Sequence, residues 1–297
     1  MTDEGSRKVE NVDYEDVDTV VEKIESVEIQ GATSIAYAGV QVLKSLADGG
    51  AEEEEIDEAA EKLRNARPTE PFLFNAIRLA RGEMGYNEVL NHIDSCRERV
   101  AENGTEVLDD VDVVYTHCHS STVTRLLEHV DGSFEIHVTE TRPLYQGRET
   151  AKELEDIGFE VEFYVDSGGL LALEDADVML IGCDAVFDSG GCVNKIGSRM
   201  FTWIAERLDV PVYVVTDSWK YDPGPGLAGR REIESRPVDE VWKDAPDGVN
   251  VKNKAFELIS PEHVTAVVSE VGVHEPDDFV NEVRAAYPEI SELSGEK

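Results

Sequence analysis

The segment 181–199, IGCDAVFDSGGCVNKIGSR, is the stretch on which the fold prediction rests. It follows the apolar run 178–181 and contains Asp184, a glycine-rich turn, and the pair Asn194 and Lys195, which we expect at the start of a helix. In an open α/β sheet the carboxyl ends of the strands face the ligand crevice, so Asp184 and Lys195 are predicted to point into it. A carboxylate and an ammonium group there suit acid–base chemistry on an anionic substrate.

Short apolar runs alternate with helical patterns on both sides of this segment. The runs lie at 111–118, 134–141, 161–166, 177–186 and 210–217. Near-continuous apolar strands separated by helices are typical of a parallel, doubly wound sheet. We expect a further strand within 250–259, a last helix at 261–272, and a loose polar end at 288–297. No G-x-G-x-x-G motif follows the first strand, so the dinucleotide-binding fingerprint is absent.

The first third of the chain has a helical pattern instead. Apolar residues recur at helical spacing in 17–29, 32–47, 55–66, 72–83 and 87–104. Glycine and proline residues separate these segments, and residues 1–14 have the composition of an acidic tail. We therefore predict an α/β protein with two domains: an acidic tail and N-terminal helical domain at 1–104, and an α/β catalytic domain at 105–297.

The charge balance is the most unusual property of the composition. The chain has 297 residues, 64 of them acidic and 27 basic, which gives a formal net charge of −37. Recurrent apolar segments favour a folded domain with an acidic surface over disorder. Such a surface is typical of a halophilic, cytoplasmic protein that needs molar salt to screen its self-repulsion. The negative charge argues against nucleic acid as a partner, and no apolar run is long enough to span a membrane.

Polar and basic side chains follow the predicted strands at the edge where a ligand is expected. They include Ser120, Arg142, Gln146, Arg148, Lys195 and Lys220. Guanidinium groups bind phosphate with two hydrogen bonds, and a helix start beside a lysine adds free N–H groups to a positive charge. These positions together predict an anion site. For each of the basic residues taken singly, the alternative is an ordinary charge at a helix start or on the surface.

Cys118, at the end of the first predicted strand, has two interpretations. None of the four cysteines has C-x-x-C spacing, so reduced thiols are expected rather than disulfides or a zinc site. Cys118 is either a buried packing residue or, near a helix start and cations, a base whose pKa is lowered towards neutrality. Successive residues alternate faces along a strand, so the run of His117, Cys118 and His119 is not expected to chelate one metal ion, which leaves one of the histidines able to orient the thiol. Asp184 is either a carboxylate for acid–base chemistry in the crevice or a capping carboxylate.

Five segments carry a resemblance to a known family. They are THCHSSTV (116–123), TETRPLYQGRETAKEL (139–154), GCDAVFDSGGCVNKIGS (182–198), WKYDP (219–223) and KAFELISPEHVTAVVSEVGV (254–273). The chain resembles the archaeal ribose-1,5-bisphosphate isomerases, in the superfamily of the initiation factor 2B alpha, beta and delta subunits and of methylthioribose-1-phosphate isomerase. The similarity extends over 21–273 and implies an N-terminal helical domain before a Rossmann-like domain.

The resemblance also implies roles for individual residues. Cys118 and Asp184 match the catalytic pair of an aldose–ketose isomerase that uses no metal or cofactor. Asp184 is expected to assist opening of the sugar ring, and Cys118 to take the C2 proton and leave an enediolate that becomes ribulose 1,5-bisphosphate. The implied substrate-binding positions are Gln30, Gly31, Arg67, Ser120, Arg142, Gln146, Asn194, Lys195 and Lys220. The reaction would serve nucleoside-monophosphate degradation, a part of AMP metabolism.

The chain departs from the family at one phosphate-binding segment. Where the family has Arg-Gly-Ala-Gly, residues 30–33 are Gln-Gly-Ala-Thr. Gln30 carries no charge, so a phosphate there would lose about 1–3 kcal/mol of charge-assisted binding. Two alternatives therefore stay open: a methylthioribose-1-phosphate isomerase, and a non-catalytic initiation factor 2B-like regulatory subunit. The partners implied are a sugar bisphosphate substrate, a nucleotide activator, and further copies of the chain in a dimer or hexamer.

Overall fold

The computed structural model describes residues 16–26, 28–29, 31–68, 70–130, 134–224 and 235–291, so Gln30 lies outside the described residues. The chain divides into two compact units. The first contains the described residues up to Cys96, together with Trp219–Tyr221 and those from Tyr287 onward. The second contains the described residues of Arg97–Ser218 and Asp222–Ala286. The division into domains at 1–104 and 105–297 stays a prediction.

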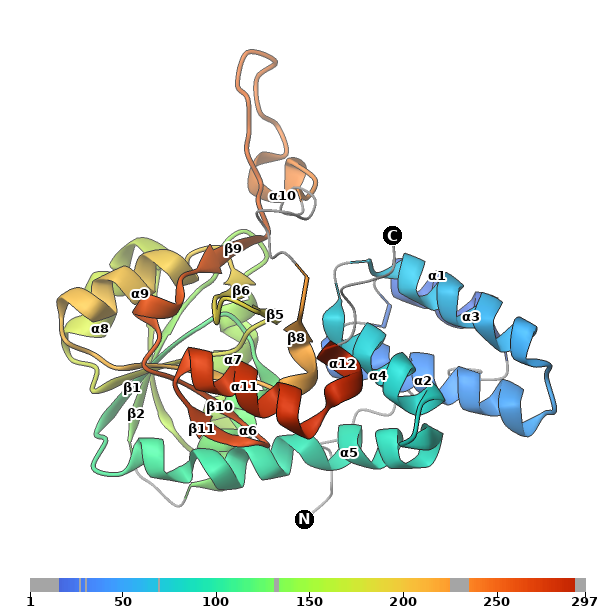
Figure 1. Ribbon diagram of the computed structural model, residues 1–297. Helices are drawn as coiled ribbons and strands as arrows, with labels where there is room; N and C mark the ends of the chain where they lie inside the picture. The colour runs from blue at the N-terminus through green and yellow to red at the C-terminus, as the bar shows by residue number, and fades with distance from the viewer. Residues whose placement is uncertain are drawn as a thin grey trace. The chain divides into compact units, whose positions relative to one another are not determined.

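Helices build the first unit (Figure 1). They are α1 (Val17–Glu25), α2 (Ala32–Asp48), α3 (Glu53–Ala66), α4 (Pro71–Arg81), the first part of α5 (Gly85–Gly104), and α12 (Pro288–Ser291). The helices predicted before residue 104 are thus confirmed. Buried apolar side chains of α1 to α4, such as Leu43 and Leu63, form its core. Asn75 of α4 donates from Nδ2 to the carbonyl oxygens of Trp219 at 2.7 Å and Tyr221 at 2.8 Å, which fixes this later segment in the unit.

A seven-stranded sheet forms the centre of the second unit. Its strands are β1 (Val113–His117), β2 (Glu135–Thr139), β3 (Glu160–Tyr164), β4 (Val178–Ile181), β7 (Val212–Val215), β10 (Ala266–Ser269) and β11 (Gly272–His274). The spatial order is β11-β10-β7-β4-β1-β2-β3, and every neighbouring pair is parallel except β10 with β11. The predicted fold class, a helical region followed by a mostly parallel doubly wound sheet, is confirmed.

Helices follow most of the strands, as parallel connections require. They are α6 (Ser121–His129), α7 (Gln146–Ile157), α8 (Gly169–Glu174), α9 (Ser198–Arg207), α10 (Asp239–Trp242) and α11 (Pro276–Ala286). The Phe201 ring of α9 packs on Tyr115 and His117 of β1, with ring centroids 5.5 and 4.8 Å away. Gly147 lets α7 approach β2, because a Cβ there would lie 1.8 Å from the carbonyl oxygen of Thr139. Among the described helices, none is both long and apolar enough to cross a membrane.

A smaller sheet begins just after β4. It contains β8 (Tyr221–Asp222), β5 (Ala185–Phe187), β6 (Cys192–Lys195) and β9 (Phe256–Ile259), in that order. Since β5 and β6 form an antiparallel hairpin, the prediction that Asn194 and Lys195 start a helix is wrong; α9 begins only at Ser198. The predicted run 177–186 divides into β4 and β5, and the strand expected within 250–259 is confirmed as β9.

The prediction of a helix at 261–272 is wrong. The segment contains a short 3-10 helix, η4 (Pro261–His263), then β10, and reaches the first residue of β11. All four residues of β10 are buried, and the strand pairs in parallel with β7, Val267 lying opposite Val214. β-branched residues suit such a buried strand, and their spacing along the chain does not distinguish it from a buried helix. At the predicted loose end, Pro288–Ser291 form α12, and 292–297 lie outside the described residues.

Candidate active site at the switch point of the sheet

The strand order places a topological switch point between β1 and β4. Val114 of β1 lies opposite Ile136 of β2 on one side and Val178 of β4 on the other. The chain continues outward from β1 through β2 and β3, and in the opposite direction from β4 through β7 and β10. Ligands of open α/β sheets bind outside the carboxyl ends of the strands at such a point. Cys118 directly follows β1 and Asp184 follows β4, so the two predicted catalytic residues flank it.

Two threonine side chains fix the backbone of Cys118. The Cys118 N–H donates to Thr141 Oγ1 at 2.9 Å, and its carbonyl oxygen accepts from Thr150 Oγ1 at 2.8 Å. Cys118 and Thr141 both have left-handed backbones, with φ of 70° and 58°. Strained conformations in non-glycine residues cost about 1–3 kcal/mol and persist where the surrounding structure imposes them. The loops after β1 and β2 therefore hold Cys118 in one defined turn.

Burial dominates the chemistry of the Cys118 thiol. The residue is 9% exposed, and loss of solvation raises its pKa to about 11. The Lys195 ammonium and a hydrogen bond from the His119 N–H oppose this rise in pKa, whereas the nearby carboxylates of Asp184 and Asp166 add to it. The prediction of a pKa lowered towards neutrality is therefore wrong. The charges of Lys195 and Asp184 both act on the thiol, so the structure brings these three predicted residues together.

The two histidines that flank the thiol have separate partners. His117 Nε2 donates to the carbonyl oxygen of Ile196 at 3.0 Å, which leaves Nδ1 to accept from the Thr139 hydroxyl at 2.7 Å. Burial lowers the pKa of His117, so the ring stays neutral at pH 7. His119 Nδ1 lies 3.1 Å from Thr150 Oγ1. The His117 ring thus ties the end of β1 to the loop that precedes α9.

His119 also belongs to a group of potential metal ligands in the second unit. One ligand atom each of His119, Glu149 and Glu153 lies within 4.8 Å of the others. The Thr150 hydroxyl already donates to the Cys118 carbonyl, so His119 Nδ1 is the donor in its contact with that hydroxyl. The same nitrogen lies 3.8 Å from Glu153. The His119 ring in this group is thus held by its contacts with Thr150 and Glu153.

Ser120 and Gly182 bring the ends of β1 and β4 side by side. Ser120 is the N-cap of α6, and its Oγ accepts from the Val123 N–H at 3.4 Å. A Cβ on Gly182 would lie 2.5 Å from Ser120 Oγ, so a larger residue would displace this side chain. The Ser120 hydroxyl consequently lies next to the short segment that leads from β4 to Asp184.

Gln146 lies at a helix start and Asn194 lies near the end of strand β6, both in the second unit. Gln146 is the first residue of α7, and its buried Oε1 has no hydrogen-bond partner among the described residues. An unmatched buried acceptor is costly, and a hydrogen-bond donor of a bound ligand would satisfy it. Asn194 Nδ2 donates to Ser198 Oγ at 3.0 Å, which holds the end of β6 against the start of α9.

The two arginines after β2 contact protein groups in this structure. Arg142 donates from Nη2 to the carbonyl oxygen of Val241 at 3.1 Å and from Nη1 to the Tyr145 hydroxyl. Arg148 lies over the Tyr145 ring, 3.7 Å from its centroid, and pairs with Glu140 at 3.6 Å. Arg142 therefore connects the loop after β2 to α10. A phosphate bound here would share the Arg142 guanidinium group with Tyr145 and Val241.

Lys195 lies at the end of β6 rather than at a helix start. Its Nζ is 4.6 Å from the centroid of the Phe256 ring. The expectation of free N–H groups beside it is wrong, because Glu257 Oε1 accepts from the N–H groups of Gly197 at 2.7 Å and Arg199 at 2.8 Å. A carboxylate at a helix N-terminus compensates the helix dipole there. The Lys195 charge acts on the Cys118 thiol from the end of β6.

The other predicted binding residues belong to the first unit. Gly31 is the N-cap of α2, with a φ of 79° that favours glycine. Arg67 is the C-cap of α3, and its buried Nε has no hydrogen-bond partner within the described chain. Lys220 ends the 3-10 helix η3 (Ser218–Lys220).

The sequence pattern does not single out two residues that matter at this edge, Thr141 and Asp166. The hydroxyl oxygen of Thr141 accepts the hydrogen bond from the Cys118 N–H. Asp166 begins the 3-10 helix η2 (Asp166–Gly168), and its carboxylate accepts from the N–H groups of Thr141 at 2.8 Å and Arg142 at 2.7 Å. One signal was available: Asp166 ends the third apolar run, much as Asp184 follows the fourth.

Comparisons with known proteins agree with this architecture. The sequence profile of the initiation factor 2 subunit family matches residues 28–276. The ribose 1,5-bisphosphate isomerase of Archaeoglobus fulgidus is 31% identical over 287 residues, which cover 89% of this chain and 91% of that protein. The translation initiation factor eIF-2B of Pyrococcus horikoshii has a TM-score of 0.77 at 23% identity, over 89% of this chain and 98% of that one, and supports the fold alone. The 5-methylthioribose 1-phosphate isomerase of the same organism has a TM-score of 0.70 at 25% identity, over 91% and 88%.

Proposed function

The chain belongs to the initiation factor 2 subunit family, and from that premise we propose that it is an isomerase that converts ribose 1,5-bisphosphate to ribulose 1,5-bisphosphate. The relative from A. fulgidus, similar over most of both chains, has the name of that enzyme. The observation that carries the proposal is the placement of Cys118 and Asp184. They follow the two strands that flank the switch point, and the Asp184 charge acts on the thiol. A protein that only binds a ligand does not require such a pair.

One proton shared between Cys118 and Asp184 is sufficient for the reaction. As the bond between C1 and the ring oxygen breaks, Asp184 protonates that oxygen and the Cys118 thiolate takes the proton from C2. The resulting enediol has its phosphate on O1 and its proton on O2. Cys118 then returns its proton to C1 while the O2 proton passes to Asp184. Both groups regain their starting states, and the substrate is oxidised at C2 and reduced at C1 without an external oxidant.

The raised pKa of Cys118 sets a condition for this mechanism. At pH 7 a thiol with a pKa of about 11 is ionised in roughly one molecule in 10⁴. The reactive pair of thiolate and carboxylic acid must therefore form in the substrate complex, by transfer of the thiol proton to Asp184. The Lys195 charge favours the thiolate in this exchange. The buried Gln146 Oε1 supplies an acceptor for a sugar hydroxyl.

Formation of ribulose 1,5-bisphosphate by the purified chain in high-salt buffer tests the proposal. We expect an active wild-type protein and losses of about 10³-fold in kcat for Cys118→Ser and for Asp184→Asn, since each removes one proton carrier. Glu162→Gln, at an exposed position of β3, is the matched control and should retain activity. A folded wild-type protein that acts on neither ribose 1,5-bisphosphate nor methylthioribose 1-phosphate would contradict an enzymatic function and favour a regulatory subunit.

Isomerisation of methylthioribose 1-phosphate is the second candidate function. Gln30 favours it, because it lacks the positive charge that one phosphate of a bisphosphate would otherwise meet. Parallel assays with both substrates decide between the two. The proposal predicts the higher kcat/KM for the bisphosphate, and the reverse ratio would assign the thioether sugar instead.

We extend the proposal to the setting of the enzyme. The net charge of −37 supports a halophilic, cytoplasmic protein. Half-exposed apolar side chains of the second unit, including Leu171 and Trp203, support association into a homo-oligomer. The resemblance adds a nucleotide activator and a role in AMP metabolism. Light scattering in molar salt should give the mass of a dimer or hexamer, and a monomer would contradict the oligomer.

A further inference from the structure

Asp166 anchors the loop that follows β2. Its two carboxylate oxygens accept hydrogen bonds from consecutive backbone N–H groups, those of Thr141 at 2.8 Å and Arg142 at 2.7 Å. Asp166 lies just beyond β3, which pairs in parallel with β2, so the contact joins the carboxyl ends of two neighbouring strands. Hydrogen bonds to an ionised acceptor are about twice as strong as those between neutral groups. The anchor is therefore a strong local constraint on this loop.

Thr141 passes this constraint to the thiol residue. Its φ of 58° is a conformation that β-branched residues rarely adopt, so the surrounding contacts must impose it. In that conformation Thr141 Oγ1 accepts the Cys118 N–H at 2.9 Å and lies 3.4 Å from His117 Nδ1. Asp166 holds the backbone of Thr141, so the position of the Thr141 hydroxyl depends on Asp166. The turn at Cys118 then depends on that hydroxyl.

We propose that Asp166 is a positioning residue for Cys118: through the Thr141 backbone it fixes the hydroxyl that receives the Cys118 N–H, and so sets the placement of the thiol relative to Asp184. The catalytic meaning of this role rests on the proposed isomerase function. Both oxygens of Asp166 are engaged by main-chain N–H groups, so it acts through Thr141 rather than on the reacting atoms. Its negative charge also acts against ionisation of the thiol.

Kinetics of Asp166→Asn test the effect on the reaction. The substitution keeps the size of the side chain and replaces one acceptor oxygen by an NH2 group, which cannot receive the second N–H. Small misplacements of a catalytic group cost as much as 10²-fold in rate, so we expect kcat to fall by about 10- to 100-fold with KM within about twofold of wild type. Glu162→Gln should keep both constants. A kcat for Asp166→Asn equal to that of wild type would overturn the proposal.

Alkylation of Cys118 by iodoacetamide at pH 8 gives a readout that needs no substrate. Asp166→Asn should be alkylated several-fold faster than wild type, because it removes a charge that opposes the thiolate and loosens the turn. Cys118→Ser identifies the labelled site. A general loss of structure would also expose the buried Cys96, Cys183 and Cys192, so faster alkylation confined to Cys118 separates the local effect from unfolding. An unchanged alkylation rate would contradict positioning even if the wild-type protein has no isomerase activity, so failure of the proposed function is recognised separately.

Variants of Thr141 test the route of the effect and remain informative if Asp166→Asn does not fold. Thr141→Val removes the hydroxyl and should reproduce the loss in kcat, whereas Thr141→Ser keeps the hydroxyl and should restore most of it. Because Asp166 acts through Thr141, the double variant Asp166→Asn with Thr141→Val should be no slower than the slower single variant. Losses that multiply would show independent routes and overturn the proposal.

Discussion

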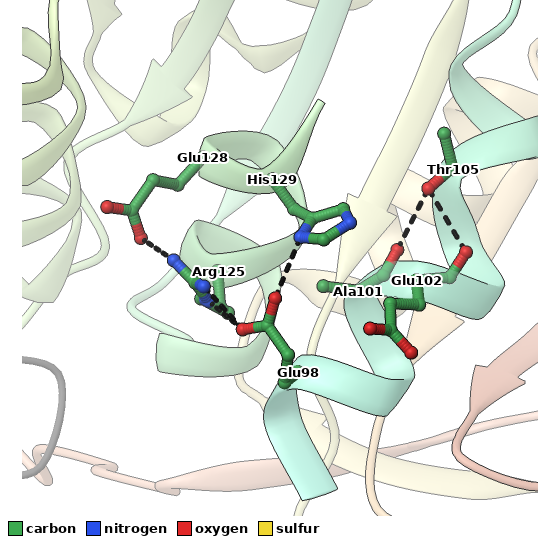
Figure 2. Close-up of polar contacts among 7 residues, drawn as sticks. All are labelled: Glu98, Ala101, Glu102, Thr105, Arg125, Glu128 and His129. Atoms are coloured by element: carbon green, nitrogen blue, oxygen red, sulfur yellow. Dashed lines mark hydrogen bonds and ion pairs between the residues drawn. The ribbon is translucent and has the colours of Figure 1, made fainter. Parts of the chain in front are cut away.

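The second unit contains two polar networks that are built in opposite ways. Between the end of α5 and α6, Arg125 pairs with Glu98 and with Glu128, and His129 Nδ1 lies 3.0 Å from Glu98 (Figure 2). Its members are polar and ionisable side chains that are partly exposed to solvent. Around Cys118, by contrast, hydroxyl groups and main-chain groups link buried residues with left-handed backbones.

The difference separates the needs of stability from those of function. Exposed ion pairs contribute about 0.2–1 kcal/mol each, and salt screens them. Strained, buried turns cost free energy that the rest of the fold must supply, and such turns gather at functional sites. In a chain with a net charge of −37, the strength of the surface ion pairs varies with salt concentration. The position of the Cys118 thiol depends instead on burial and on hydrogen bonds within the protein.

The largest expected effect comes from crowding the strand-end region. Gly147→Ala places a Cβ 1.8 Å from the Thr139 carbonyl oxygen, so α7 must move away from β2 and from the Cys118 turn. We expect the free energy of unfolding in molar salt to fall by at least about 3 kcal/mol. Gly248→Ala, where no atom lies within 4 Å of the added Cβ, is the control and should be neutral. Equal stability of the two variants would show that this region is less tightly packed than described.

The second effect is a pH dependence that belongs to Cys118. Its folded pKa of about 11 exceeds the unfolded value of about 8.5, so the unfolded chain releases the proton first as pH rises. The stabilising contribution is complete below the unfolded pKa and is lost as pH rises through the folded pKa, with a total of at most about 3 kcal/mol. Urea unfolding at pH 8 and pH 10.5 should show a smaller decrease for Cys118→Ser than for wild type. Parallel decreases would place the thiol in contact with solvent.

The smallest effect is expected in the network of Figure 2. Arg125→Ala should cost about 1 kcal/mol or less at the lowest salt concentration at which the protein stays folded, and close to nothing in molar salt. The Arg125 guanidinium lowers the pKa of Glu98, so this stabilisation is present above the ordinary pKa of a glutamate and is lost as pH falls through the lowered value. Urea unfolding at two salt concentrations measures it. A loss that persists in molar salt would mean that the pair is better shielded from solvent than its exposure indicates.

Secondary structure was predictable from the sequence wherever the spacing of apolar residues within one segment indicates which of its residues are buried. The helix at 32–48 is one example, since its apolar residues recur at helical spacing, and the strand at 113–117 is another, since it lies in a short, near-continuous apolar run. Residues 261–272 contain apolar side chains at spacings that fit a helix or a strand, and the neighbouring strand β7 decides between them. Lys195 is placed in a strand by pairing with a segment far along the chain, Phe256 lying opposite it.

The candidate site was predictable in its members but not in its physical chemistry. Cys118 and Asp184 could be found because strand ends meet at one edge of a parallel sheet. The direction of the thiol pKa could not, because burial by distant segments outweighs the nearby Lys195 charge. Asp166 and Thr141 could not be found either, since their contacts run through main-chain N–H groups, which no residue pattern reports.

An NMR titration of the protein labelled with ¹³C at the cysteine Cβ atoms tests the central claim, that Cys118 and Asp184 lie together at a buried strand edge. Cys118→Ser assigns the signal, and Glu162→Gln serves as the control for a distant carboxylate. We predict a Cys118 midpoint near pH 11 in the wild-type protein and a lower midpoint in Asp184→Asn, because that carboxylate opposes ionisation of the thiol. A midpoint near the ordinary value of about 8.5 that Asp184→Asn leaves unchanged would contradict the account.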